Sequence, residues 1–473
     1  MIDDADVTPG LKTRPTSETN AGKPSVELRR DLGVTDLTLT QVLFIVGLPW
    51  VGVAAKQGPA HVLLWLAAIV FFYLPSAAVV IHLNRAMPLE GGLYQWAKIG
   101  FNERTGFLVA WNLWLFAILN TSETGLQVTQ YFRYILSASN AAAILNSNAF
   151  VAGMNIVILT ALVTITILGL NIGKWVHKAG GALMLGTFAI LVALPWLNVW
   201  KGTLGTFHPL AAAMPAMTIL SVNIFAKMGF GALGGFEYVA IHAGECHSPE
   251  KTIARSVAWA APIIGVMFIL GTASVLAFVP IDQIDLIAPI PQVLSAGFTP
   301  LGSFRGIAPA AILVLLCIRV AQASVMFAGN TRLPMVAGWD GLLPAWFTRL
   351  HPRRQTPVNS IVFVGVVTLA FSMAGLIGVG KQEAFQLLWN ASAIFYALTY
   401  LVMFAIPIVG VRSPLWLKVA AASGFVMTLA FVGLSILPII SVQSRLGFAL
   451  KISAVVVATN AVGLAVFRGR RRQ

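Results

Sequence analysis

Charged residues are scarce in this chain. Asp, Glu, Lys and Arg make up 10% of its 473 residues, whereas 58% are hydrophobic, and the mean hydropathy is +0.82. A soluble domain carries about 25% charged residues, so this composition excludes a soluble globular protein. The apolar runs are about 20 residues long, which is the length of a helix that crosses a bilayer. The composition therefore predicts an all-α integral membrane protein.

Cysteine and histidine are also rare, with two and seven residues. Cys246 and Cys317 lie far apart and lack the spacing of a metal-binding pair. The histidines are scattered among different segments, so they indicate no catalytic or metal-binding cluster. The loops between the apolar runs are short and leave no room for a separate soluble domain. We therefore predict no metal, no cofactor and no enzymatic activity.

Twelve apolar runs are long enough to span a membrane. They cover residues 36–57, 61–83, 106–136, 149–170, 180–200, 216–244, 256–279, 306–337, 358–377, 384–410, 416–440 and 449–467. We expect the polar residues 1–32 to form a flexible cytoplasmic tail and residues 468–473 to form a basic cytoplasmic tail.

Acidic residues are outnumbered by basic residues, 17 to 31, which gives a formal net charge of +14. The basic residues gather in alternate loops, for example at Lys174, Arg255 and Arg354. Because Lys and Arg are enriched on the cytoplasmic side of membrane proteins, we expect both termini in the cytoplasm and the chain in the cytoplasmic (inner) membrane, in contact with lipid. This distribution explains the charge without nucleic acid, which we exclude as a partner. The sequence leaves the oligomeric state open.

The sixth apolar run contains a glycine cluster in MGFGALGGFE (228–237), with Gly229, Gly231, Gly234 and Gly235. Each glycine weakens a helix by about 1 kcal/mol. Backbone that leaves the helix at membrane depth must be buried in protein or line an aqueous cavity. The cluster therefore predicts an interrupted helix, or else the close helix packing for which small residues are typical. This run by itself leaves both interpretations open.

The first apolar run is interrupted in a similar way, in FIVGLPWVG (44–52). Pro49 lacks an amide donor and suits the first turn of a new half-helix. Interruptions in runs one and six, five spans apart, favour two inverted five-helix repeats with a central site between the broken helices. Half-helix ends there offer N–H groups to an anionic group and carbonyl groups to an ammonium. The expected ligand is a zwitterion.

Three motifs, in the same order, resemble the amino acid, polyamine and organocation (APC) superfamily. The first, MPLEGGLYQWAKIGFNERTGFLVAWNLWL (87–115), is similar to the family's loop and third-helix entry. The second, GFGALGGFEYVAIHAGECHSPEKTIARSV (229–257), is similar to its sixth-helix signature. The third, NTRLPMVAGWDGLLPAWFTRLHPRRQTPVNSI (330–361), is similar to its helix-eight exit. The resemblance covers about residues 33–410.

This resemblance implies the LeuT-like fold, with twelve transmembrane helices of which helices 1 and 6 are broken. Its first repeat would be residues 33–205, its second repeat 206–410, and two further helices would follow in 411–467. It also implies a permease that moves an amino acid or a related amine by alternating access. One departure is the first helix, where the family usually has a Gly-Ser-Gly type of motif and this chain has GLPWVG.

The resemblance also implies where the substrate binds, between the two broken helices with a lining from helices three and eight. The expected substrate-binding residues are Gly47, Leu48, Pro49, Gly52, Thr121, Thr124, Gly231, Ala232, Gly234 and Gly235.

Four charged residues, Glu123, Lys227, Glu237 and Arg319, lie deep within apolar runs. Such residues are costly in a membrane and mark ion or substrate pathways by default. They either form ion pairs that hold the bundle together or couple transport to a driving ion. The two roles are compatible, because alternating access can break and remake a pair. The resemblance adds Glu245, at the cytoplasmic end of the sixth run, as part of an inner gate.

The sequence leaves alternatives open for the ion that drives transport and for the substrate. Ser324 stands alone on the eighth run, where a sodium site would need a pair of hydroxyl groups, so we expect proton coupling or exchange. A polyamine or another small organic solute is the alternative substrate, and a substrate sensor on the same fold is the alternative class. A major-facilitator transporter also has twelve spans, but the short segment 246–255 lacks its longer central loop.

Overall fold

The computed structural model describes residues 32–470, apart from residues 90, 137, 247, 305, 340, 342, 375–379, 441 and 443. The α-helices of the first half are α1 (Val34–Ile45), α2 (Leu48–Ala55), α3 (His61–Ala68), α4 (Leu74–Ala86), α5 (Leu93–Gly100), α6 (Glu103–Ser122), α7 (Thr124–Tyr131), α8 (Ala138–Asn146), α9 (Asn148–Leu168) and α10 (Leu170–Trp200). Those of the second half are α11 (Ile219–Ala226), α12 (Pro249–Phe278), α13 (Pro289–Phe298), α14 (Ile307–Trp339), α15 (Val358–Ala374), α16 (Lys381–Ala405), α17 (Leu415–Ser435) and α18 (Arg445–Arg470).

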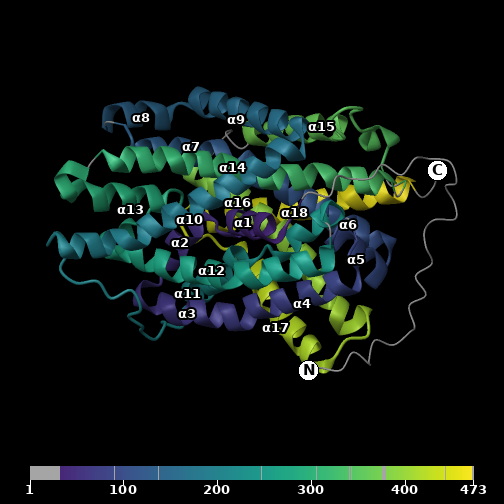
Figure 1. Ribbon diagram of the computed structural model, residues 1–473, viewed down its shortest axis with the longest axis horizontal. Coiled ribbons are helices and arrows are strands. Elements are labelled where there is room, and N and C mark those ends of the chain that lie inside the picture. The colour runs from purple at the N-terminus through teal and green to yellow at the C-terminus, as the bar shows by residue number, and fades with distance from the viewer. Residues whose placement is uncertain are drawn as a thin grey trace.

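Short 3-10 and π-helical segments connect or extend these helices. They are η1 (Gly58–Ala60), η2 (Ile69–Tyr73), η3 (Phe132–Tyr134), η4 (Lys227–Ala232), η5 (Phe236–Glu245), η6 (Ile281–Gln283), η7 (Thr299–Phe304), η8 (Ala345–Thr348) and η9 (Ile406–Gly410). The long helices lie side by side along the longest axis of the molecule, with α8 and α13 at one end and α5 at the other (Figure 1). In the described part of the chain the β-structure is an isolated bridge between Leu32 and Cys246.

Local sequence signals explain where several of these helices begin. The side chains of Asn102, Ser147 and Thr218 accept hydrogen bonds from backbone N–H groups in the first turns of α6, α9 and α11. Such caps satisfy donors that have no partner within the helix. Pro249 occupies the first turn of α12, where its missing N–H costs nothing.

Ten described helical segments are long and apolar enough to cross a membrane, and the bent pair of α1 and α2 makes eleven. The shorter apolar helix α15 has 17 residues and ends just before the segment 375–379, which lies outside the described residues. The prediction of an all-α, multi-pass membrane protein is confirmed, whereas the exact count of twelve stays a prediction.

The position of a helix in the bundle decides what it faces. In the third span, Glu103–Tyr134, 72% of the most apolar stretch is buried within the protein, against 17% in the last span, Arg445–Gly469. Most of the apolar stretch of the last span is therefore exposed at the surface of the protein, and an apolar surface at membrane depth suits contact with lipid. The third span is therefore central, and α18 lies at the periphery.

The first span is broken at Val46 and Gly47. Helix α1 ends at Ile45 and α2 begins at Leu48, with a bend of 49° between them. Pro49 lies in the first turn of α2, as the sequence predicted. The expected break was wider, because Gly52 lies inside α2. Its backbone approaches α13, and a Cβ at Gly52 would lie 2.8 Å from Cβ of Pro289.

The sixth span is interrupted at Gly234 and Gly235. Helix α11 continues through the π-helix η4, and η5 begins after Gly235, whose φ of 144° is a conformation that other residues rarely adopt. Gly229 and Gly231 lie within η4 and make close packing contacts instead. The two interpretations of the cluster therefore apply to different glycines.

Candidate functional site

A cavity lies where the two interrupted spans meet, beside α6, α7, α14 and α16. Its water-accessible volume is about 70 Å³, room for several water molecules or a small solute. It is lined by Phe44, Ile45, Gly47, Leu48, Pro49, Trp50, Phe116, Asn120, Gln127, Phe230, Gly231, Gly234, Arg319, Gln322, Met326, Trp389, Ala393 and Tyr396.

One part of the cavity wall is aromatic. The rings of Phe116 and Tyr396 stack with their centroids 4.1 Å apart, and those of Trp50 and Trp389 lie 5.3 Å apart. Such stacked and tilted pairs hold each ring in a defined position. This wall suits an apolar or aromatic group of a ligand.

Trp50 lies between the two broken helices. A Cβ at Gly47 would lie 2.6 Å from its Cδ1, and a Cβ at Gly231 would lie 2.7 Å from its Cη2. Both distances are shorter than van der Waals contact, so the indole can occupy this place only while both positions are glycine. The glycines therefore shape the cavity as well as the backbone.

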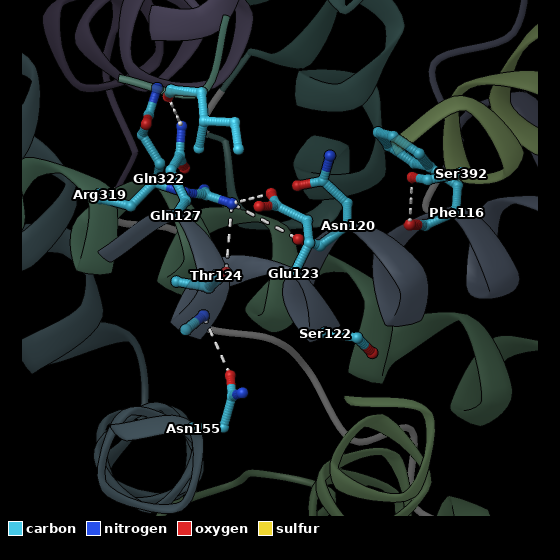
Figure 2. A network of polar contacts seen from close by, with 12 residues as sticks. Phe116, Asn120, Ser122, Glu123, Thr124, Gln127, Asn155, Arg319, Gln322 and Ser392 are labelled. Atoms are coloured by element: carbon cyan, nitrogen blue, oxygen red, sulfur yellow. Dashed lines mark hydrogen bonds and ion pairs between the residues drawn. The ribbon is translucent and has the colours of Figure 1, made fainter. Parts of the chain in front are cut away.

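The polar part of the cavity contains Arg319 of α14. Its Nη2 lies 2.5 Å from Oε1 of Glu123 and donates to Oγ1 of Thr124 at 3.2 Å and to the carbonyl oxygen of Asn120 at 3.4 Å. Figure 2 shows the guanidinium directed at the junction of α6 and α7, where Glu123 is located. Both charged side chains are buried, with exposed fractions of 6% and 0%.

Burying the Arg319–Glu123 pair costs desolvation free energy, and the attraction between the two charges offsets that cost. Removing two charges from water costs several kcal/mol per ion, and their attraction repays it only when the geometry is good. Arg319 reaches the cavity, whereas Glu123 lies behind it. A ligand in the cavity would therefore meet a guanidinium whose charge is already compensated.

Gln322 connects α14 to the broken end of α1. Its Nε2 donates to the carbonyl oxygens of Leu43 and Val46, both at 2.9 Å. Carbonyl groups in the last turn of a helix have no partner within the helix, and leaving one buried and unpaired costs about 1–3 kcal/mol. One side-chain amide therefore stabilises the end of α1 at the break.

Glu237 is held by two tyrosines of α16. The hydroxyl groups of Tyr396 and Tyr400 each donate to one of its carboxylate oxygens. Tyr400 also accepts the backbone N–H of Gly235 at 2.6 Å. Glu237 is 1% exposed. The interruption in the sixth span is thus fixed to α16 through a buried carboxylate.

Lys227, at the start of η4, is 1% exposed. Its Nζ donates to Oδ1 of Asn390 at 3.1 Å and lies 3.5 Å from Oγ of Ser435. It also lies 5.5 Å from the ring centroid of Phe431. Of the four charged residues predicted at depth, only Glu123 and Arg319 pair with each other in the described structure.

The structure brings together part of the residues expected to bind the substrate. Six residues from the substrate-binding, coupling and gating sets line the cavity: Gly47, Leu48, Pro49, Gly231, Gly234 and Arg319. The others lie outside its lining: Gly52, Thr121, Glu123, Thr124, Lys227, Ala232, Gly235, Glu237 and Glu245. Thr124 still contacts Arg319, and Gly235 contacts Tyr400.

Glu245 lies at the end of η5 and is buried. Its carbonyl oxygen accepts the backbone N–H of Leu32 at 3.1 Å. The segment before α1 is thereby attached to the end of the sixth span. This contact involves only backbone atoms, and the gating role of the Glu245 side chain stays a prediction.

Sequence reasoning missed several residues of the cavity, although a signal was present. Asn120, Glu123 and Gln127 are spaced by three and four in an apolar run, as are Arg319 and Gln322. Polar residues at this spacing lie on one face of a helix. Glu123 and Arg319 were predicted from their charge, whereas the neutral amides Asn120, Gln127 and Gln322 were not.

The comparison with protein families decides the identity. The family model described as amino acid permease matches residues 32–460. The chain belongs to the amino acid permease family. The resemblance to the APC superfamily is confirmed, and the protein is a multi-pass membrane transporter.

Relatives and solved structures agree with this assignment. The methylthioribose transporter of Bacillus subtilis (strain 168) is 24% identical over 388 residues, which are 78% of this chain and 80% of the relative. The branched-chain amino acid permease BcaP of the same organism is 24% identical over 397 residues, 76% of this chain and 80% of the relative. The crystal structure of MhsT in complex with L-phenylalanine matches with a TM-score of 0.61 at 12% identity, covering 86% of this chain and 99% of that chain. The predicted LeuT-like fold is confirmed.

Proposed function

We propose that the protein is a secondary active transporter that moves an amino acid or a related amine across the cytoplasmic membrane by alternating access. The observation that carries the proposal is the cavity between the breaks of the first and sixth spans, with an aromatic wall and the buried Arg319 at its polar part. Its volume of about 70 Å³ fits a small solute rather than a polymer.

The ends of the broken helices support a substrate with a carboxylate or an ammonium group. Helix α2 begins at Leu48 in the cavity lining, and the N-terminus of a helix attracts anionic groups through its N–H donors. The aromatic faces of the cavity wall suit an apolar side chain or, by cation–π contact, an ammonium. Pro49 contributes no donor, so fewer amides face the ligand than in an uninterrupted first turn.

The coupling mode belongs to this proposal as well. We infer proton coupling or exchange, with Glu123, Lys227, Glu237, Glu245 and Arg319 as the coupling or gating residues. In support of this, Oγ of Ser324 already lies 3.3 Å from Nε2 of His177. That contact engages Ser324, and the other hydroxyl residue of α14, Thr331, donates to the carbonyl oxygen of Ala328 at 2.9 Å.

The proposed cycle moves two inverted repeats, residues 33–205 and 206–410, relative to each other. The presence of one interrupted span at the start of each repeat supports this division. Both termini are proposed to lie in the cytoplasm. Asp36 lies 3.4 Å from both Lys174 and Lys178, so basic residues of α10 lie beside the start of α1, which supports a cytoplasmic position for this end.

A second candidate is transport of another small organic solute, such as a polyamine or a sugar derivative. The relative named methylthioribose transporter favours it, because it covers as much of the chain as the amino acid permease does. A substrate sensor on the same fold is a further alternative class. Uptake kinetics separate a sensor from a transporter.

The test is a counterflow screen with the purified full-length protein in liposomes. Vesicles are preloaded with one amino acid, putrescine, agmatine or methylthioribose, and entry of the same labelled compound is followed. We expect one chemical class to give saturable counterflow, because exchange requires alternating access. Absence of counterflow across the panel, in protein shown to be folded, would refute transport of these compounds and favour the sensor.

A further inference from the structure

Lys227 is a buried amine that has no counter-ion among the described residues. Within the described residues, no carboxylate lies within the 4.0 Å of an ion pair from its Nζ, and its hydrogen bonds go to the neutral side chains of Asn390 and Ser435. The two carboxylates at similar depth are engaged elsewhere, Glu123 with Arg319 and Glu237 with two tyrosines.

The surroundings of Lys227 contain few other titratable groups. The elements packed against η4 are α2, α3, η2, α11 and α17, and α16 supplies Asn390. Their titratable or charged groups with described side chains are His61, Tyr73, Glu383, Tyr396, Tyr400 and Lys418, together with Lys56 just after α2. Glu383, the acidic residue among them, pairs with Lys451 at 3.7 Å. None of them donates to or accepts from Lys227 in the described structure.

An ammonium in such a place is costly. Burial of an unpaired charge costs several kcal/mol even after relaxation, and two neutral acceptors and one ring offset only part of this cost. The amine can avoid the cost by releasing its proton. A lysine at membrane depth that can exist in both forms is suited to bind and release a proton.

Lys227 lies between one end of the bundle and the interruption of the sixth span. Its partner Ser435 is the last residue of α17, and Lys227 is eight residues from the start of α11, on the order of 12 Å along the helix. In the proposed orientation this end of the bundle faces outward. On its other side, η4 leads directly to the interruption at Gly234 and Gly235.

We propose that Lys227 is the binding site of the coupling proton, separate from the substrate cavity. The Nζ lone pair takes a proton from water on the outer side, and the ammonium donates to Asn390 and Ser435. The same N–H bond breaks when the sixth span rearranges, and the proton passes to water on the inner side. This inference rests on the proposed function and names the residue that couples it to protons.

The experiment compares Lys227→Gln and Lys227→Met with the unmodified protein, all full length and in liposomes. Two quantities are measured with the same panel of amino acids, putrescine and agmatine: accumulation driven by a pH gradient, and counterflow at equal pH on both sides. Lys451→Gln is the control, since it removes a lysine that is 54% exposed and forms a surface pair. Folding is checked by thermal unfolding of each variant.

We expect both Lys227 variants to lose accumulation driven by the pH gradient and to keep counterflow, while Lys451→Gln keeps both. A purely structural role of Lys227 would reduce both quantities together. Accumulation that persists in Lys227→Gln, or a joint loss of both activities in folded variants, would overturn the proposal.

The two proposals fail in different ways. Unmodified protein that shows counterflow but no response to a pH gradient would refute the role of Lys227 and leave the proposed transport intact. Unmodified protein without counterflow would refute the transport itself for the compounds used.

Discussion

The buried charges differ in how each is compensated. Arg319 and Glu123 share an ion pair, Glu237 accepts from two tyrosines, and Lys227 contacts neutral groups. The free energy of a buried pair depends on both members being present, because loss of one leaves an uncompensated charge in a medium of low dielectric constant. Replacing a charged residue by a neutral one should therefore change the stability of the folded protein by a different amount in each of the three arrangements.

Glu123→Gln should destabilise the folded protein by about 3–5 kcal/mol, because it leaves the Arg319 guanidinium buried without a counter-charge. The double variant Glu123→Gln with Arg319→Met should be more stable than the single variant. Thermal unfolding in detergent measures both. The surface pair of Lys451 and Glu383 provides a control, since Lys451→Gln should change stability by about 1 kcal/mol or less. Equal stability of the single and double variants would show that the pair does not contribute in this way.

The sequence predicted which charges lie at depth but not how they are compensated. A charge within an apolar run can be seen in the sequence, whereas its partner depends on which helix faces meet. Tyr396 and Tyr400 are about 160 residues from Glu237 in the chain, and nothing local connects them. The same holds for Gln322, whose partners are the carbonyl groups of α1.

At the scale of single elements, the two interrupted spans show how position decides the role of a glycine. Gly235 has a positive φ and lies at the interruption, whereas Gly229 lies within η4. A Cβ at Gly235 would lie 2.5 Å from Cγ1 of Ile45 in the core, but a Cβ at Gly229 would meet the flexible end of Met427 at 2.6 Å. The clash can be relieved only in the second case.

Gly235→Ala should lower the free energy of unfolding by about 2–4 kcal/mol, because a positive φ costs 1–2 kcal/mol and overpacking adds to it. Gly229→Ala should be nearly neutral, because it favours the helix and displaces only the methyl end of Met427. The two variants change the same residue type six positions apart, so each controls for the other. Thermal unfolding and counterflow rates measure the difference, and equal effects would contradict this assignment of roles.

The interruptions were predictable to within a few residues. Pro49 indicates the start of a half-helix by a local steric rule, so the break at Val46 and Gly47 follows from the sequence. The exact end of the sixth-span interruption does not follow from the sequence, because glycine permits both helical and non-helical backbone conformations. What selects the break at Gly235 is the hydrogen bond from its N–H to Tyr400, which is a tertiary contact.

At the scale of the whole molecule, the direction of the chain in the membrane can be tested. The loop between α10 and α11 and the loop before α15 should lie on opposite sides, the first outside and the second in the cytoplasm. In a chain with Cys246 and Cys317 replaced by serine, Ala212→Cys should react with an impermeant maleimide in intact cells. Arg353→Cys should react only after permeabilisation, because basic loops remain inside.

Both test positions are exposed in the structure, so a lack of labelling would not result from burial. The cysteine-free chain gives the background. The reverse labelling pattern would place both termini outside and would also reverse the water path proposed for Lys227.

The overall fold was predictable because hydropathy and motif order act over the whole chain. Long apolar runs can only be helices in lipid, and three motifs in the same order imply the arrangement of the helices. The number of spans follows less directly from the sequence, since α15 is short and α1 and α2 are each half a span. Helix length alone does not distinguish a broken span from two separate helices.

Trp50 has a consequence for how sequences of this kind can change over evolutionary time. Its indole excludes a side chain at Gly47 and at Gly231, which are about 180 residues apart in the chain. A lineage cannot alter either glycine first without a penalty, so replacement of Trp50 by a smaller residue must come before both. Once it has, the two glycines are released from constraint and the cavity is larger. One tryptophan thus determines both the size of the cavity and whether two distant glycines are free to vary.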